Sequence, residues 1–233
     1  MIATFDHAED ITPHIKTFWF RPQQPVRYTA GQFTELHLPH HADERGIRRW
    51  FTLSSSPTEP LLGITTAFTP TSGSTYKRKL LALPPGTTLT LADPMGDFVL
   101  PKDTNTPLVF VAGGVGITPV RSMVQYLRDT NQKRDVHIIY AVTKPHELAF
   151  MALFRSYGAK ITPVITTADP GYSGKTGSLT ARRALALSGN DEHTLLYISG
   201  PEPMVESFAA KLPALGVPPH RLVTDYFPGY QQF

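Results

Sequence analysis

Residues 47–57 contain side chains that together suit a phosphorylated, flat heteroaromatic ligand. The stretch holds Arg48, Arg49, Trp50, Phe51, Thr52, Ser54, Ser55 and Ser56. Arginine keeps its charge and forks onto phosphate oxygens, and an aromatic two residues further along a strand shares its face. We therefore expect Arg49 and Phe51 on one face of a strand, with Arg48 and Trp50 on the other. A phosphate anchor, a stacking ring and hydroxyls at the ring edge describe a flavin nucleotide site.

The same composition also suits an ordinary barrel strand with a surface arginine, core aromatics and a serine-rich turn, so the surrounding elements matter. Up to about residue 101, short alternating runs are broken by turn residues, which predicts an antiparallel sandwich or barrel. The expected strands are residues 14–20, 33–38, 50–53, 62–68, 87–91 and 98–100.

From residue 108 onward, the pattern changes to buried strands that alternate with helices. This alternation predicts βαβ units and a parallel sheet. The expected strands are residues 108–112, 137–142, 161–166, 194–199 and 221–226. The expected helices are residues 118–127, with Thr118 as N-cap, and residues 147–154, 180–187 and 204–212. A linker at residues 101–107 divides the chain into expected domains 1–101 and 102–233.

Composition narrows the function classes. A hydrophobic content of 41% with 18% charged residues predicts a packed globular core. The sequence has no cysteine, which excludes disulfides, cysteine-ligated iron–sulfur clusters and thiol nucleophiles.

A net charge of +3 without a long basic run argues against a nucleic-acid partner. Neither a signal peptide nor an apolar stretch of about 18 residues is apparent, so we expect a cytoplasmic protein without membrane insertion.

Six segments, in order along nearly the whole chain, resemble motifs of the ferredoxin–NADP reductase superfamily. They are Tyr28-Thr29-Ala30-Gly31-Gln32-Phe33, Arg49-x-Phe51-Thr52-x-x-Ser55, Ser74-Thr75-Tyr76-Lys77, Asp93-Pro94-Met95-Gly96-Asp97-Phe98, Gly113-Gly114-Val115-Gly116-Ile117-Thr118-Pro119 and Gly200-Pro201-Glu202-Pro203-Met204-Val205. The chain departs from the family pattern at Ala30, Phe51, Asp93 and Ser199, where proline, tyrosine, glycine and cysteine are usual. The resemblance implies a two-domain β plus α/β fold. An N-terminal six-stranded antiparallel Greek-key β-barrel would bind FAD, and a C-terminal Rossmann-like parallel α/β domain would bind NAD(P).

The resemblance also implies the flavin contacts. Arg49 would neutralise a flavin phosphate, Phe51 would stack on the isoalloxazine ring, and Thr52 would hydrogen-bond near N5. Further candidate cofactor contacts are Trp50, Ser55, Ser74, Thr75 and Lys77. The last three would hold phosphates through backbone N–H groups, hydroxyls and an ammonium, unless they only begin an ordinary surface helix. FAD is favoured over FMN because this loop and the aromatic tail suit a cofactor that carries adenine.

Two glycine-containing loops would bind the pyridine nucleotide. The first would let a dinucleotide approach the start of a helix, unless it is only a tight turn, and its candidates are Gly114, Gly116 and Thr118. The second follows the fourth strand of the parallel sheet, and its candidates are Gly200, Pro201, Glu202 and Met204. Ser199, just before it, would lie near nicotinamide C4.

The C-terminal tail resembles the family's carboxylate-x-aromatic ending. Asp225 would take the carboxylate place near the active centre. Phe227 would cover the second flavin face, or else pack as a core aromatic. Tyr230 and Phe233 would either reach the adenine or simply pack. The candidate catalytic residues are Thr52, Ser199, Asp225 and Phe227.

These assignments predict an NAD(P)H-dependent flavoprotein reductase that passes hydride to FAD and then electrons to a separate carrier, such as ferredoxin or flavodoxin. Two alternatives remain open: a reductase of free flavin, quinones or ferric chelates, and a non-turnover subunit of a larger electron-transfer complex. Asp169, after the third strand of the parallel sheet, slightly favours NADH over NADPH as the nucleotide substrate. His37, His40 and His41 suggest a metal site, but a solvated loop without metal is expected.

Overall fold

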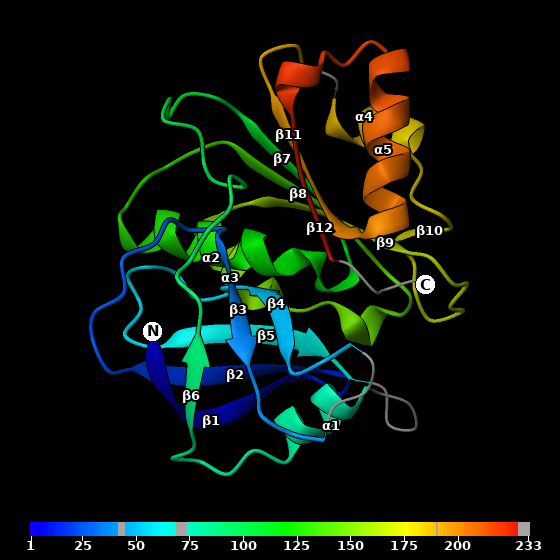
Figure 1. The fold of residues 1–233 in the computed structure, drawn as a ribbon. Coiled ribbons are helices and arrows are strands. Elements are labelled where there is room, and N and C mark those ends of the chain that lie inside the picture. The colour runs from blue at the N-terminus through cyan, green and yellow to red at the C-terminus, as the bar shows by residue number, and fades with distance from the viewer. Residues whose placement is uncertain (42–44, 69–73, 190, 228–233) are drawn as a thin grey trace.

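The N-terminal part of the chain forms an antiparallel sheet (Figure 1). Its elements are β1 (Ile2–Thr12), β2 (Ile15–Pro22), β3 (Phe33–His37), β4 (Arg48–Thr52), β5 (Leu62–Ala67), α1 (Thr75–Leu81) and β6 (Thr88–Leu91). The strand order is β4-β3-β6-β1-β2-β5, and an antiparallel bridge between Leu53 and Ile64 joins the two edges. The sheet thereby closes into the expected six-stranded Greek-key barrel. The structure is a computed structural model that describes residues 1–41, 45–68, 74–189 and 191–227.

Alternate residues of these strands fill the barrel. Phe18 and Phe20 of β2, Leu36 of β3 and Leu91 of β6 are at most 1% exposed and belong to one cluster. The two-residue repeat of a strand points such side chains to one face, and each contributes about 1.5–3 kcal/mol by leaving water. The closed core gives β4 a fixed position on the barrel wall.

The sequence prediction misses one strand of the barrel, β1, and predicts one strand that is absent, at residues 98–100. β1 is a long strand that the alternation does not indicate, because its register shifts between Phe5 and His7 and again between Asp10 and Thr12. Such bulges interrupt the two-residue repeat. Residues 98–100 form no strand. Phe98 is instead buried edge-on against Tyr197 of the other domain, with ring centroids 5.2 Å apart, so its apolar character reflects domain packing.

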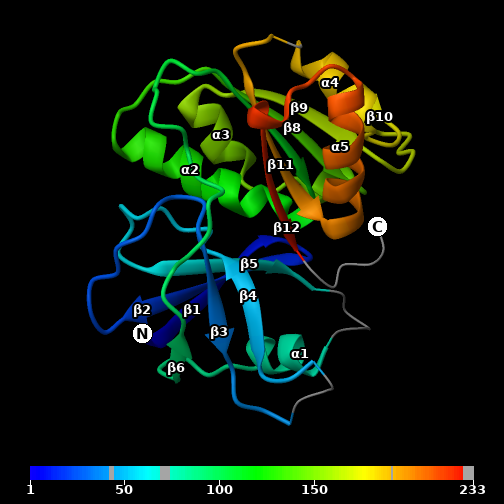
Figure 2. The same ribbon diagram turned by 45° about the horizontal axis from the view of Figure 1, so that its top comes forward.

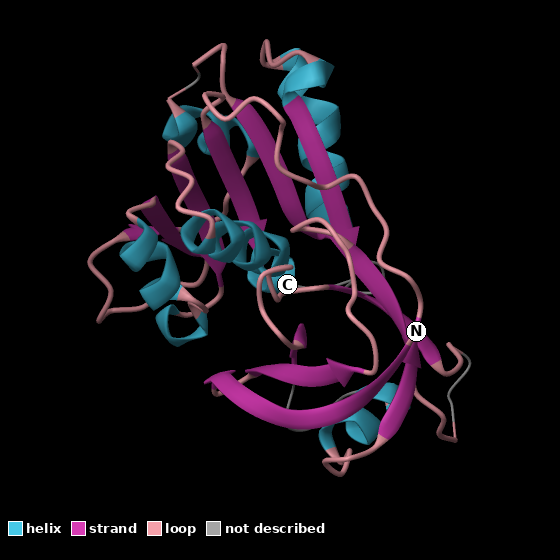
Figure 3. Cartoon of the chain, turned by 90° about the vertical axis from the view of Figure 1, so that its left-hand side faces the viewer, coloured by secondary structure: helices cyan, strands magenta, loops and turns pink. Residues whose placement is uncertain are grey.

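The C-terminal part forms a parallel sheet with helices on both faces (Figure 3). Its elements are β7 (Leu108–Gly113), η1 (Gly114–Gly116), α2 (Ile117–Asp129), β8 (Val136–Val142), η2 (Pro145–Glu147), α3 (Met151–Tyr157), β9 (Lys160–Ile165), β10 (Lys175–Thr176), α4 (Ala181–Ser188), β11 (Leu195–Pro201), α5 (Glu202–Ala214), η3 (Pro219–Arg221) and β12 (Leu222–Phe227). The order is β10-β9-β8-β7-β11-β12. One core cluster joins the sheet to α2 and α3, and another joins it to α4 and α5, which confirms the Rossmann-like class.

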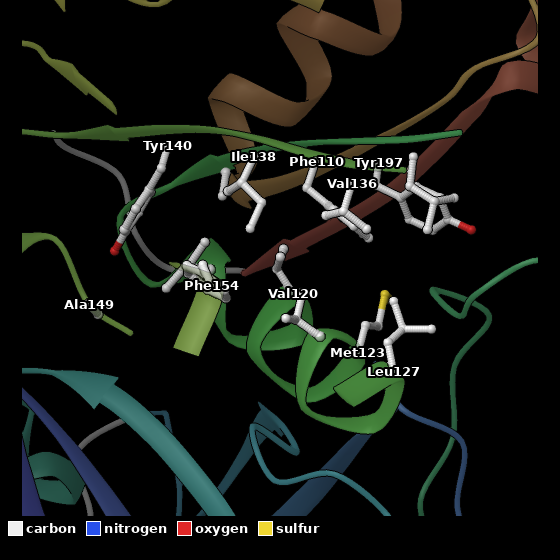
Figure 4. Close-up of a cluster of buried hydrophobic side chains, with 14 of the residues drawn as sticks. Phe110, Val120, Met123, Leu127, Val136, Ile138, Tyr140, Ala149, Phe154 and Tyr197 are labelled. Atoms are coloured by element: carbon white, nitrogen blue, oxygen red, sulfur yellow. The ribbon is translucent and has the colours of Figure 1, made fainter. Parts of the chain in front are cut away.

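Helix α2 lies between the parallel sheet and the barrel (Figure 2). Val120, Met123 and Leu127 point from α2 toward the sheet, where Phe110 and Tyr197 belong to the same cluster (Figure 4). That cluster also includes Ile15, Ala30 and Phe98 from the barrel side. Because α2 is buried against both parts, it is the element through which they contact each other.

The helices differ from expectation in two places. The N-cap of α2 is Gly116, and Thr118 is a buried residue of its first turn, because η1 already winds the chain before the helix begins. The helix expected at residues 147–154 is divided into η2 and α3. Phe150 separates them with a positive φ of 61°, a left-handed conformation that a helix cannot contain.

Candidate functional site

Strand β4 presents two different faces, as its alternation predicts. Arg49 and Phe51 are partly buried and face α1, whereas Arg48 and Trp50 are exposed. Trp50 is 48% exposed and packs edge-on against Phe33, with ring centroids 5.4 Å apart. The structure therefore brings Arg49 and Phe51 together and leaves Trp50 on the opposite face.

Tyr76 of α1 lies against both residues of the flavin motif. Its ring centroid is 6.0 Å from that of Phe51, and the Arg49 guanidinium carbon is 5.1 Å from it. Tyr76 is fully buried and donates to the Leu36 carbonyl at 2.8 Å, while burial raises the pKa of its phenol. Arg49 also donates to the Gly46 carbonyl at 3.0 Å. Tyr76 and the Gly46 carbonyl therefore hold the guanidinium near Phe51, and its role as a phosphate anchor stays a prediction.

The first turn of α1 holds the three predicted phosphate residues. The Ser74 hydroxyl is the N-cap and accepts from the Lys77 backbone N–H at 3.3 Å. The Lys77 ammonium donates to the Ala67 carbonyl at 2.7 Å. The Thr75 hydroxyl lies 3.2 Å from Nε2 of His40. Each of these three side chains already has a polar contact within the protein. Their role in binding a phosphate stays a prediction.

The serine turn after β4, residues 54–56, is buried. The Ser55 hydroxyl is hydrogen-bonded to the Tyr28 hydroxyl at 2.8 Å and accepts from the Gly63 backbone N–H at 2.9 Å. The Ser55 carbonyl accepts from the Ser122 hydroxyl of α2 at 2.5 Å. Ser55 therefore fixes the turn from inside, and a direct contact to a flavin stays a prediction.

Two predicted catalytic hydroxyls have no protein partner. Among the described residues, Thr52 Oγ1 and Ser199 Oγ are buried side-chain oxygens without a hydrogen bond. Leaving a buried hydroxyl unsatisfied costs about 1–3 kcal/mol, and proteins retain such a cost mainly where function uses the group. The two oxygens therefore fit polar ligand atoms, such as the edge of a flavin ring and a nicotinamide.

The two predicted nucleotide loops meet at the switch point of the parallel sheet. β7 and β11 are neighbours, and the strand order reverses between them. Ligands of open α/β sheets bind outside the carboxyl ends of strands at such a point. Gly114 and Gly116 follow β7, whereas Gly200 and Pro201 end β11 and lead into α5. The topology thus places both loops where a dinucleotide is expected.

Close backbone contact explains the glycines of these loops. A Cβ on Gly116 would lie 2.2 Å from the Ser199 carbonyl oxygen, and one on Gly200 would lie 3.2 Å from the Gly113 nitrogen. A Cβ on Gly113 would lie 2.7 Å from the sulfur of Met204. The candidates of the two loops are therefore packed against each other. Glu202 is the first residue of α5 and lies in its first turn.

Asp225 lies beside Ser199, its register partner in the pair of β11 and β12. Burial raises the pKa of the Asp225 carboxyl to about 6, although a hydrogen bond from the Tyr226 backbone opposes the shift. The backbone of Phe227 pairs with Pro201. The Phe227 side chain, Tyr230 and Phe233 lie outside what the structure describes, so their predicted roles toward the flavin stay predictions.

Comparisons with known proteins agree with this arrangement. Residues 110–210 match the family described as the oxidoreductase NAD-binding domain. The propane 2-monooxygenase reductase component of Rhodococcus jostii (strain RHA1) is 26% identical over 235 aligned positions, which cover 94% of this chain and 61% of that relative. Ferredoxin NADP+ reductase from Neisseria gonorrhoeae, solved with bound FAD and NADP, matches with a TM-score of 0.79 at 22% identity, covering 97% of this chain and 98% of that one. The chain therefore has the fold of this reductase and contains a segment similar to the oxidoreductase NAD-binding domain.

Several curated relatives that match are longer than this chain. The toluate 1,2-dioxygenase electron transfer component of Pseudomonas putida is 28% identical over 147 positions, which cover 61% of this chain and 43% of that relative. The chain spans about half the length of the curated relatives it matches. In the part of the chain that the structure describes, no helix has the length and apolar character required to cross a membrane.

Tyr76 lies within the candidate site, although the motif pattern alone does not single it out. The signal for it is the spacing of Tyr76 and Leu80, the two buried residues of α1. Residues four positions apart share a helix face, so this spacing places Tyr76 toward the barrel. The pattern does not reveal that Arg49 and Phe51 would meet it there.

We expect the stability of the protein to fall as the pH rises from about 4 to about 6, because of Asp225. Its folded-state pKa of about 6 lies above its ordinary value of 3.8, so the folded state binds the proton more tightly than the unfolded state. Between these values the unfolded state loses its proton first, and unfolding becomes more favourable. Asp225→Asn removes this loss and should stabilise the protein at pH 7 by about 1–2 kcal/mol.

Urea unfolding of wild type and Asp225→Asn across pH 4 to 7 measures the effect, and the informative quantity is the difference between the two curves. Glu206→Gln, on the exposed side of α5, is the matched carboxylate-to-amide control and should change stability little. If the unfolding free energies of wild type and Asp225→Asn changed with pH in parallel, the raised pKa of Asp225 would be contradicted.

Proposed function

We propose that the chain is an NAD(P)H-dependent flavoprotein reductase that serves a separate electron acceptor. The observation that carries this proposal is the contact between the predicted nucleotide loop and the predicted flavin motif. The loop η1 contacts barrel strand β5, and Ser122 of the following helix donates to the carbonyl of Ser55 at 2.5 Å. Direct hydride transfer requires the two ligands to lie side by side, and this contact brings their sites to one boundary.

Within this proposal, residues 1–101 form the flavin domain and residues 102–233 the nucleotide domain. When bound, FAD would accept hydride directly from nicotinamide C4 at N5 and release electrons to the acceptor, so no general base is needed. Arg49 and Lys77 would neutralise the phosphates of FAD, and Phe51 would support one face of its ring. Gly114, Gly116, Gly200 and Pro201 would let the dinucleotide backbone approach the sheet edge.

Three polar side chains would orient the reacting rings. The Thr52 hydroxyl would donate to the polar edge of the flavin, and the Ser199 hydroxyl would contact the nicotinamide. Both are buried without a partner in the described structure, which supports these roles. Asp225, beside Ser199, would be mostly ionised at neutral pH and would become mostly neutral only below its raised pKa of about 6. The carboxylate would favour the positive charge that the nicotinamide ring gains when it loses hydride.

We also propose that the acceptor is a separate electron carrier, such as ferredoxin, flavodoxin or an oxygenase component. Two relatives support this class of acceptor: one is an electron transfer component of a dioxygenase, and the other is a reductase component of a monooxygenase. We place the reaction in the cytoplasm, the compartment that supplies reduced nicotinamide nucleotides.

Phe51 should hold FAD less tightly than a tyrosine at the same place. Tyrosine is usual in the superfamily motif, and its hydroxyl helps to hold the ribityl chain. Phe51 keeps the stacking face and lacks that hydrogen bond, which is worth about 0.5–1.5 kcal/mol. Phe51→Tyr should therefore tighten FAD binding about threefold to tenfold. Titration of apoprotein with FAD by fluorescence measures this change, and an unchanged nanomolar dissociation constant would contradict it.

The experiment that tests the proposed function is an absorbance spectrum of the purified protein, followed by anaerobic titration with NADH and NADPH. We expect a flavin spectrum that is bleached by one of the two nucleotides, and subsequent reduction of an added carrier protein. A colourless protein that cannot be reconstituted with FAD, and that does not oxidise either nucleotide, would favour a non-turnover subunit. Rapid turnover with free flavin, quinones or ferric chelates but not with ferredoxin or flavodoxin would favour the free-acceptor alternative.

A further inference from the structure

Arg121 of helix α2 bridges the two domains through its guanidinium group. It forms a two-pronged ion pair with Glu59 of the barrel, in which one nitrogen contacts Oε2 and the other donates to Oε1 at 2.8 Å. The side chains of Arg121 and Glu59 are only 12% and 19% exposed. Removal from water strengthens such a bidentate pair and makes its geometry specific.

The same guanidinium contacts the backbone that follows the flavin motif. Arg121 donates to the Ser54 carbonyl at 2.9 Å. The Glu59 carboxylate, in turn, accepts from the Ser56 backbone N–H at 2.6 Å. Next to Arg121, the Ser122 hydroxyl accepts from the Gly31 backbone N–H at 3.3 Å, so it binds the barrel at a second point. The turn at residues 54–56 is therefore attached to α2 through two successive residues, Arg121 and Ser122.

Aromatic rings from both domains hold Arg121 in place. Its guanidinium carbon lies 5.5 Å from the ring centroid of Trp19 in the barrel and 5.9 Å from that of Phe150 in the nucleotide domain. Phe150 has a φ of 61°, which is uncommon for a bulky residue and requires support from its surroundings. Arg121 thus touches the serine turn, the barrel wall and the loop after β8 with one rigid group.

We propose that Arg121 and Glu59 are positioning residues that set the distance between the flavin ring and the nicotinamide; this inference rests on the proposed function. Helix α2 begins directly after Gly116, and Thr52 lies two residues before Ser54, whose carbonyl Arg121 holds. A shift of α2 relative to this turn would displace the nucleotide loop from the flavin motif. Displacements of about 1 Å in such geometry slow a reaction about 100-fold without removing either ligand.

The test uses the full-length protein with FAD and compares Arg121→Gln, Glu59→Gln and a matched control, Thr58→Val. Thr58 donates to Asp129 at 2.6 Å and so joins the same loop to the same helix, but at an exposed rim. For each variant, anaerobic single-turnover reduction is measured at saturating NADH or NADPH, together with dissociation constants for FAD and the nucleotide. We expect Arg121→Gln to slow reduction about 10- to 100-fold, with both dissociation constants changed less than about threefold. Thr58→Val should leave the rate within about twofold of wild type.

Two further measurements separate positioning from general structural damage. Stacking of nicotinamide on flavin produces a long-wavelength charge-transfer absorbance, which should weaken in Arg121→Gln and remain in Thr58→Val. In apoprotein, amide hydrogen exchange at residues 54–56 and 113–118 should accelerate in Arg121→Gln only, because local opening becomes easier there. Arg121→Lys keeps the charge but not the two-pronged geometry, so it should recover little of the rate.

The outcomes distinguish failure of the proposed function from failure of the positioning role. A wild-type protein that neither nucleotide reduces would contradict the proposed function, and the positioning role would fall with it. Reduction of Arg121→Gln at the wild-type rate would overturn the positioning role alone, as would loss of FAD from that variant or an equal slowing in Thr58→Val. If Arg121→Gln does not fold, Glu59→Gln, which keeps the shape of the partner, decides by the same criteria.

Discussion

Replacement of Gly116 by alanine is expected to lower the free energy of unfolding by about 3 kcal/mol and to abolish nucleotide binding. The added Cβ would lie 2.2 Å from the Ser199 carbonyl oxygen and 2.5 Å from its carbon. Gly116 itself has a φ of −59°, which alanine adopts without strain, so the loss comes from close contact and not from backbone conformation. β11 would have to move away from η1, and this movement would separate the two nucleotide loops.

Urea unfolding and calorimetric titration with NADH and NADPH measure the two effects. Gly171→Ala is the matched control, because the nearest heavy atom to its added Cβ is the Asp169 carboxylate oxygen at an ordinary 3.4 Å. We expect this control to change stability by less than about 1 kcal/mol. If Gly116→Ala lost similarly little unfolding free energy and still bound the nucleotide, the prediction would be wrong, because β11 and η1 would then separate at little cost.

Thr52→Val is expected to raise the stability of the apoprotein by about 1 kcal/mol and to slow reduction of bound FAD about 10- to 100-fold. Thr52 Oγ1 is buried without a hydrogen bond, so a methyl group in its place removes an unsatisfied polar atom at nearly constant volume. The same hydroxyl is the proposed donor to the flavin edge. Opposite effects on stability and activity are expected of a residue retained for function.

Thr34→Val provides the control, since Thr34 is equally buried but its hydroxyl donates to the Ala92 carbonyl at 2.7 Å. That variant should lose about 1–2 kcal/mol of stability, because it leaves an acceptor unpaired. Unfolding of the apoproteins and anaerobic stopped-flow reduction of the FAD-loaded proteins measure both properties. A destabilised Thr52→Val apoprotein, or an unchanged rate of reduction, would show that the hydroxyl has another use.

Local spacing was sufficient to predict much of this protein. The two-residue repeat correctly places Arg49 and Phe51 opposite Arg48 and Trp50, because strand geometry depends only on neighbouring residues. The change from alternating runs to buried runs with helices predicts an antiparallel sandwich or barrel followed by a parallel sheet, and the structure has the barrel and the parallel sheet. Glycines at 116 and 200 lie where an added Cβ would meet the backbone of the other nucleotide loop, as a tight turn requires. Each of these features follows from residues that are near one another in the chain.

Other features depend on contacts between distant segments, and only the tertiary structure decides them. The bulges of β1 interrupt the alternation, so the sequence pattern does not reveal that strand. The apolar residue Phe98 suggests a strand, but its side chain packs against the other domain. The Ser55 hydroxyl is hydrogen-bonded to the Tyr28 hydroxyl, 27 positions away, and to the backbone N–H of Gly63 on the neighbouring strand β5. The pair of Arg121 and Glu59 spans 62 positions of the chain. No spacing rule links such residues, because packing and strand register bring them together only after the whole chain has folded.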